Sequence, residues 1–165
     1  MKNLIFFCLS LLSLSSQAGT VPEIVRHVCA SGESQDGVRI QPVPFQDMTE
    51  DDAYAGKYKA TYSTFNGVKI GYAKKNEKAS IIYGQRLYPV SKADLINVSK
   101  AEYESMIEKG VVELGQAADW SLLTSKNKEQ YLCVALNKSM EKAIPLTYLL
   151  SLSTKPHHLY FQSGL

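Results

Sequence analysis

The chain has 165 residues, of which 45% are hydrophobic, and a formal net charge of +2 at pH 7. This length is enough for one domain with a real hydrophobic core. The nearly neutral balance gives no overall electrostatic attraction to nucleic acid, and we therefore expect no nucleic-acid partner.

The first residues have the pattern of a secretory signal peptide. A charged residue is followed by the apolar run Leu4–Leu14, and Ser16 and Ala18 place small residues where a signal peptidase reads. The run has about eleven residues, whereas a membrane-spanning helix needs about 20. We predict a signal peptide over 1–18, one mature domain over 19–165, no membrane span, and a periplasmic or secreted location.

Two cysteines remain after the predicted leader, Cys29 and Cys133. In an oxidising compartment such a pair favours a disulfide. The bond would close a loop of about 105 residues, which the chain-entropy model values at roughly 4 to 5 kcal/mol. A redox or nucleophilic thiol is the alternative, but the chain has no Cys-x-x-Cys pair.

The mature chain is predicted to open with a short helix. Thr20 is placed to cap it, and Glu23 lies where a capping box puts its acid. The helix would end near Cys29, and its apolar positions recur at helical spacing: Val21, Ile24, Val25 and Val28.

The next region changes character. Residues 31–37 have loop composition, and 38–43 alternate like a strand. Pro42 lies inside that run and restricts it to a sheet edge. The acidic stretch 47–52 is interpreted as a turn.

Residues 57–73 give the strongest local signal for a β-hairpin. Two strand-like runs flank Asn66 and Gly67, the preferred residues of a two-residue turn. The resulting register puts Phe65, Val68, Ile70 and Tyr72 on one face and Tyr58, Ala60 and Tyr62 on the other. Both faces carry aromatic rings, so the pattern alone leaves open which face is buried.

A second hairpin is predicted from 80–83 and 86–90. Ser99 and Glu102 then form a capping-box pattern, which opens a helix that Gly110 should end.

Further strands are predicted over 95–98, 131–136 and 146–152, all rich in aliphatic residues. The segment 157–162 is either one more strand or a loose tail. Residues 159–164 also match the core of a viral protease site that is used to remove tags, and we interpret the match as chance.

Together these elements predict an α+β fold. We expect a mostly antiparallel sheet of five to seven strands, two short helices and one disulfide. Trp120, the single tryptophan, is expected to anchor the core.

Lysines and tyrosines alternate through the first hairpin and make it the best candidate binding site. Tyrosine is enriched at recognition surfaces because it offers a large, rigid contact area. The predicted binding residues are Tyr58, Tyr62, Tyr72, Lys57, Lys59 and Lys69. The alternative is that the lysines only keep an outer face soluble and protect its edge.

The sequence predicts no metal site, no cofactor and no catalytic residue. His157 and His158 are adjacent, and on a strand they would point to opposite sides. The acidic stretch 47–52 lacks the ligand spacing and central glycine of a calcium loop. No nucleophile or phosphate-binding motif is present.

Three functions fit these observations, and they favour a binding protein over an enzyme. The first is a small exported protein that occludes a protein partner, as an enzyme inhibitor or toxin-immunity protein does. The second is a secreted effector or surface protein that binds an anionic host or cell-envelope glycan. The third is a hydrolase whose site is assembled from scattered residues, including His157 or His158.

Overall fold

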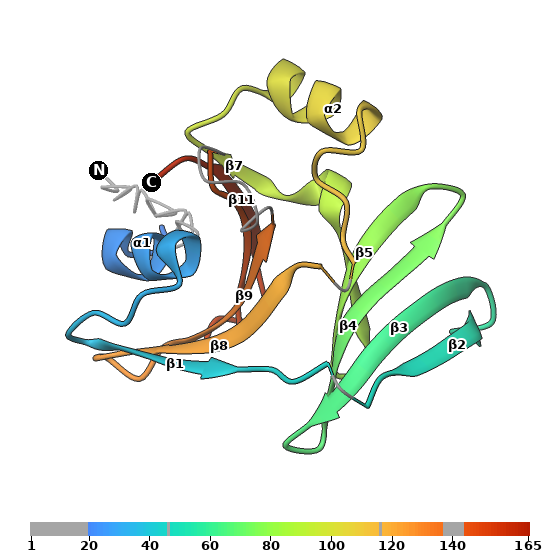
Figure 1. Cartoon of the computed structure of the whole chain (residues 1–165), viewed down its shortest axis with the longest axis horizontal. Coiled ribbons are helices and arrows are strands. Elements are labelled where there is room, and N and C mark those ends of the chain that lie inside the picture. Colours follow the sequence, from blue (N-terminus) through green and yellow to red (C-terminus); the bar gives the residue numbers. More distant parts are fainter. Residues whose placement is uncertain (1–19, 46, 116, 137–143) are drawn as a thin grey trace, which may run out of the picture.

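The computed structural model describes residues 20–45, 47–115, 117–136 and 144–165 (Figure 1). The predicted signal peptide lies outside these residues. Within them the chain forms two α-helices, one short 3-10 helix and eleven strands. The strands divide into a six-stranded and a five-stranded sheet, both dominated by antiparallel pairs. The predicted α+β class, with two helices and one disulfide, is confirmed.

The six-stranded sheet, called sheet A, takes most of its strands from the C-terminal half of the chain. All its neighbours are antiparallel except β11 and β7, which are parallel. Across the sheet the strands are β1 (Val38–Pro42), β8 (Asp119–Ser125), β9 (Gln130–Leu136), β10 (Leu146–Ser151), β11 (Leu159–Ser163) and β7 (Asp94–Ile96). The strand predicted at 38–43 is therefore β1, at the sheet edge, where Pro42 is tolerated.

The five-stranded sheet, called sheet B, is a meander in which consecutive strands are neighbours. In order they are β2 (Thr49–Tyr54), β3 (Tyr58–Phe65), β4 (Val68–Lys75), β5 (Lys78–Tyr83) and β6 (Arg86–Pro89). The acidic stretch that we interpreted as a turn is thus largely the edge strand β2. Its exposed carboxylates protect an open sheet edge from pairing with other chains.

Helix α1 (Glu23–Ser31) covers one face of sheet A, against β1, β8, β9 and β10. Its buried face includes Val25 and Val28. The N-cap is Pro22, not Thr20, and no side chain caps the helix. Gly32 ends it with a left-handed φ of 69°, a conformation that glycine adopts without steric cost.

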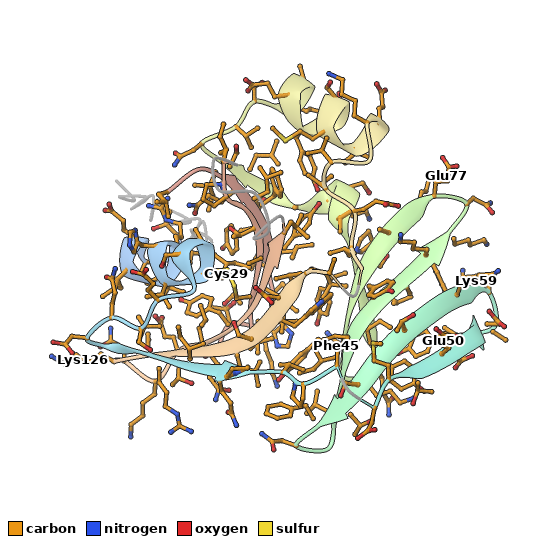
Figure 2. All side chains as sticks on the ribbon, viewed as in Figure 1. Cys29, Phe45, Glu50, Lys59, Glu77 and Lys126 are labelled. Carbon is orange, nitrogen blue, oxygen red and sulfur yellow. A yellow bond between two sulfur atoms is a disulfide. The ribbon has the colours of Figure 1, made fainter. Side chains whose placement is uncertain are left out.

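The disulfide joins α1 to sheet A. Cys29 and Cys133 are bonded with their Cα atoms 5.7 Å apart, and both residues are buried. Figure 2 shows Cys29 between the helix and the sheet. The predicted pairing is confirmed, and it fixes the N-terminal helix to a central strand.

The other face of sheet A packs on sheet B and forms the main core. Tyr148, Phe161 and Leu150 from sheet A meet Ile70 and Ile81 from sheet B, and all five are fully buried. Trp120 joins the same core with 3% of its surface exposed, as predicted. The segment 157–162 is mostly strand β11, whose Phe161 lies inside this core.

Helix α2 (Lys100–Glu108) begins with the predicted capping box. The Ser99 side chain accepts from the Glu102 N–H, and the Glu102 carboxylate accepts from the Ser99 N–H. Tyr103 fixes the helix to the core by donating to the Val90 carbonyl over 2.7 Å. Its oxygen lies 3.0 Å from the Tyr148 hydroxyl, which therefore donates to it.

The first hairpin has the predicted register. Phe65 faces Val68, and Tyr62 faces Gly71 across β3 and β4. The structure also decides which face is buried against sheet A: it is the face of Phe65, Val68, Ile70 and Tyr72.

None of the described helices is long and apolar enough to cross a membrane.

Candidate functional site

The predicted binding residues do not form one surface. Tyr58, Tyr62 and Lys69 lie on the face of sheet B that points away from sheet A, which we call the outer face. Lys59 and Tyr72 lie on the opposite face, and Lys57 precedes β3. The alternation of side chains along a strand separates residues that are close in sequence.

The outer face has its own small hydrophobic cluster. We call it the outer-face cluster, and it consists of Tyr54, Tyr58, Ala60, Tyr62, Ala73, Ile82 and Leu87. All of these residues belong to sheet B. Among the described residues, therefore, no helix and no strand of sheet A contributes to this cluster.

Lysines cover the tyrosine rings of the outer-face cluster. The Lys69 ammonium lies 4.5 Å from the ring centre of Tyr62 and 5.6 Å from that of Tyr54. The Lys57 ammonium lies 5.5 Å from the ring centre of Tyr58. These distances are within the range of cation–π attraction. Tyr62 is only 8% exposed, so its ring is a packed element of the face.

Gly71 makes this packing possible. It lies opposite Tyr62, and a Cβ atom at Gly71 would approach the Thr61 carbonyl oxygen to 2.1 Å and the Tyr62 Cα to 2.6 Å. These distances are far shorter than van der Waals contact. The close approach of β3 and β4 below Tyr62 therefore requires glycine at this position.

The remaining predicted residues lie on the inner side of sheet B. Tyr72 is half-buried and stacks on Trp120 with ring centres 6.4 Å apart. Lys59 and Tyr72 line a shallow depression of about 240 Å³ together with Glu50 and Asp52 of β2. The acidic strand thus brings carboxylates beside the lysines, which weakens the positive potential on this side.

A larger hollow, of about 810 Å³, lies between the tip of the β4–β5 hairpin and the C-terminal end of α2. We call it the hairpin hollow. Sequence reasoning missed it, because its walls come from segments about 30 residues apart. It is lined by Tyr58, Lys74, Lys75, Glu77, Lys78, Ala79, Ser80, Pro89, Val90, Ser91, Ile107, Glu108, Gly110, Val112, Glu113 and Leu114.

The two C-terminal histidines lie away from the hairpin hollow. His157 Nδ1 is 2.8 Å from the Tyr88 hydroxyl, and His158 Nδ1 is 3.8 Å from an Asp94 carboxylate oxygen. Burial, followed by the charges of Arg86 and Lys155, lowers the pKa of His157. No histidine lines the hairpin hollow, and the described residues contain no group of three ligands that could hold a metal ion.

Tyr54 is the tyrosine of the outer-face cluster that the sequence analysis did not predict. It follows the acidic stretch 47–52, which we interpreted as a turn, and it was assigned to no strand. In the structure it ends β2 opposite Tyr58, and its ring centre is 5.8 Å from that of Tyr62. A strand interpretation of 49–54 would have placed it beside the predicted tyrosines.

Comparison with known proteins finds no similar family, protein or structure. No family model and no curated protein matches the sequence, and no solved structure matches the fold.

Proposed function

We propose that this protein is a small exported binding protein that occludes a protein partner, in the manner of an enzyme inhibitor or an immunity protein. The contact surface is the outer face of sheet B. The observation that carries the proposal is a packed cluster of tyrosines on a sheet face that no other described element covers.

The composition of the outer face supports a protein partner. Tyrosine contributes contact area with little loss of conformational entropy, and it is enriched among the residues that dominate binding energy. Here three tyrosines lie together, and Tyr54 and Tyr62 are held by packing against each other. A rigid face of this kind loses little freedom when a partner covers it.

The lysines favour an anionic partner. Lys57 and Lys69 hold their ammonium groups over tyrosine rings. No salt bridge within the described residues pairs either of these two lysines. An acidic protein surface would supply the missing carboxylates and accelerate association.

The disulfide and the leader-like sequence support export. A buried disulfide between Cys29 and Cys133 persists in oxidising compartments. The pattern of residues 1–18 is typical of a secretory signal. We therefore place the protein in the periplasm or outside the cell, where its partner would also be found.

The test is capture of a partner by the oxidised protein, followed by charge reversal on the outer face. The double variant Lys57→Glu and Lys69→Glu should weaken binding of the captured protein by about tenfold or more, because like charges would then face each other. The matched control is Lys126→Glu, an exposed lysine on the β8–β9 turn, far from sheet B (Figure 2).

Two outcomes would contradict the proposal. One is recovery of no stoichiometric partner from the compartment that holds the native protein. The other is equal loss of binding in the Lys126→Glu control. Retention on an anionic glycan column that falls steeply with added salt would instead support a glycan-binding protein.

A further inference from the structure

We propose that the hairpin hollow binds a zwitterionic ligand of short-peptide size, with its anionic group at Lys75 and Lys78 and its cationic group at Glu108. The hollow of about 810 Å³ is within the range of ligand sites, which are about 300–1,000 Å³. This site does not rest on the outer-face proposal, and its test uses different residues.

The hairpin wall carries an uncompensated pair of positive charges. Lys75, the last residue of β4, and Lys78, the first residue of β5, are direct cross-strand neighbours, and both are exposed. Like charges in this position destabilise a hairpin. Glu77 lies in the turn between them, at the tip labelled in Figure 2, but no salt bridge joins it to either lysine. An anionic ligand group would relieve the repulsion.

The helix wall carries the opposite conflict. Glu108 is the last residue of α2, where the helix dipole is negative, and the last turn contains no basic residue. The C-cap residue Lys109 follows it, but Lys109 does not line the hairpin hollow. A carboxylate at this end of a helix is unfavourable, whereas a cation is stabilised there. A cationic ligand group would therefore be attracted by both the Glu108 carboxylate and the negative end of the helix dipole.

Two other charged residues of the hollow are paired with each other, and part of the lining is apolar. Lys74 and Glu113 form a 3.1 Å ion pair that joins the hairpin to the segment after α2. Val112 and Leu114, on either side of Glu113 in this segment, are buried, and Ile107 of α2 is half-buried. Lys75, Lys78 and the turn residue Glu77 thus lie on the hairpin wall and Glu108 lies on the helix wall, and the rest of the lining includes aliphatic side chains. This arrangement fits a ligand with charged ends and an apolar middle.

Conflicts between local charges and local structure are expected at functional sites, where a ligand compensates for them. Lys75, Lys78 and Glu108 would be simple to replace if stability alone mattered, because all three are exposed. Their convergence on one hollow is what carries the inference.

The probe is an end-capped tetrapeptide with glutamate at one end, lysine at the other and two leucines between, used in both sequence orders. Binding to the oxidised protein is followed by amide chemical shifts in a titration. We expect shifts at residues of the hairpin hollow. The comparison peptide, with glutamine at both ends, should bind at least about tenfold more weakly, because it carries neither charge.

The variants separate the two walls. Lys75→Gln with Lys78→Gln should weaken binding of the charged peptide about tenfold, and so should Glu108→Gln. The matched controls are Lys100→Gln and Glu104→Gln, an exposed ion pair on α2 outside the hollow, and they should leave binding unchanged. A second readout needs no ligand: Lys75→Gln alone should raise the denaturant midpoint, because it removes the repulsion.

The proposal is overturned if neither charged peptide produces shifts at millimolar concentration, or if the glutamine peptide binds equally well. A lowered denaturant midpoint in Lys75→Gln would also overturn it, since the lysine pair would then be stabilising. Loss of partner binding in the Lys57→Glu and Lys69→Glu variant has no bearing on these outcomes, because neither residue lines the hairpin hollow.

Discussion

The Tyr88 hydroxyl lies 2.8 Å from Nδ1 of His157, and this hydrogen bond joins the edge strand of sheet B to the loop before β11 in sheet A. The two rings are also stacked, with centres 5.9 Å apart. Tyr83 packs edge-on against the same histidine. His157 is therefore a contact between the two sheets at the end of β6.

This contact should make stability depend on pH. Partial burial, Arg86 and Lys155 all lower the pKa of His157, and only a hydrogen bond with the Leu152 backbone opposes them. The unfolded chain, with the ordinary histidine pKa of about 6.5, then binds a proton more readily than the folded protein. The free energy of unfolding should be constant above that pH and should fall as the solution is acidified through it.

The measurement is the denaturant midpoint between pH 8 and pH 5 for the wild type and for His157→Gln, which cannot be protonated. The variant should lose about 1 kcal/mol at pH 8 through its weakened hydrogen bond. Its midpoint should then fall less than that of the wild type on acidification. Parallel curves for the two proteins would show that His157 is not the group responsible.

Loss of the disulfide should be costly because it closes a long loop. Cys29 and Cys133 are 104 residues apart in sequence. The double variant Cys29→Ala with Cys133→Ala should lose about 4 kcal/mol of unfolding free energy in the chain-entropy model. Reduction of the wild type should lower its free energy of unfolding by a similar amount and should leave the double variant unchanged. A double variant as stable as the oxidised protein would refute this prediction.

Thr147 offers a stabilising substitution. Its hydroxyl is buried without a hydrogen-bond partner, and the residue is 1% exposed. Thr147→Val keeps the shape and removes the unsatisfied polar group, so it should stabilise the protein by about 1 kcal/mol. Thr124→Val, on a partly exposed position of β8, is the matched control and should change stability by less than about 0.5 kcal/mol. Chemical denaturation measures both, and destabilisation by Thr147→Val would contradict the prediction.

Two glycines should respond differently to alanine. A Cβ at Gly71 would collide with the backbone of β3, whereas one at Gly110 would meet nothing within 4 Å. Gly71→Ala should therefore cost about 3 kcal/mol through overpacking. Gly110→Ala has only the penalty of its left-handed φ of 68° and should cost about 1 kcal/mol. Equal losses in thermal or chemical unfolding would show that β3 and β4 can separate to accept a side chain.

Local interactions explain the elements that were predicted well. The hairpin register follows from Asn66 and Gly67, because a two-residue turn fixes which residues face each other. The start of α2 follows from Ser99 and Glu102, which are three residues apart and satisfy each other's backbone groups. The start of α1 is a counterexample, because the N-cap is Pro22 and the prediction of Thr20 was wrong.

The arrangement of the candidate site depends on contacts between distant segments, which local sequence patterns do not specify. The sequence identified a hairpin rich in tyrosine and lysine and put Tyr62 and Tyr72 on opposite faces, but it left open which of the two rings faces the core. Tyr72 is half-buried against Trp120, which lies 48 residues later in the chain and belongs to sheet A. The acidic strand β2 was also missed, because its charged residues are atypical of strands and only pairing with β3 stabilises it there.

What the sequence determined by itself was the α+β class, the turn and register of the first hairpin, the capping box of α2 and the pairing of Cys29 with Cys133. The turn, the register and the capping box depend on residues that are close in sequence. The disulfide could be predicted because only two cysteines follow the predicted signal peptide, so they allow a single pairing. Only the tertiary structure decided which face of the hairpin is buried and where the hairpin hollow lies. Both results depend on how two sheets and a helix pack together, and side-chain alternation alone is the same for either face of a strand.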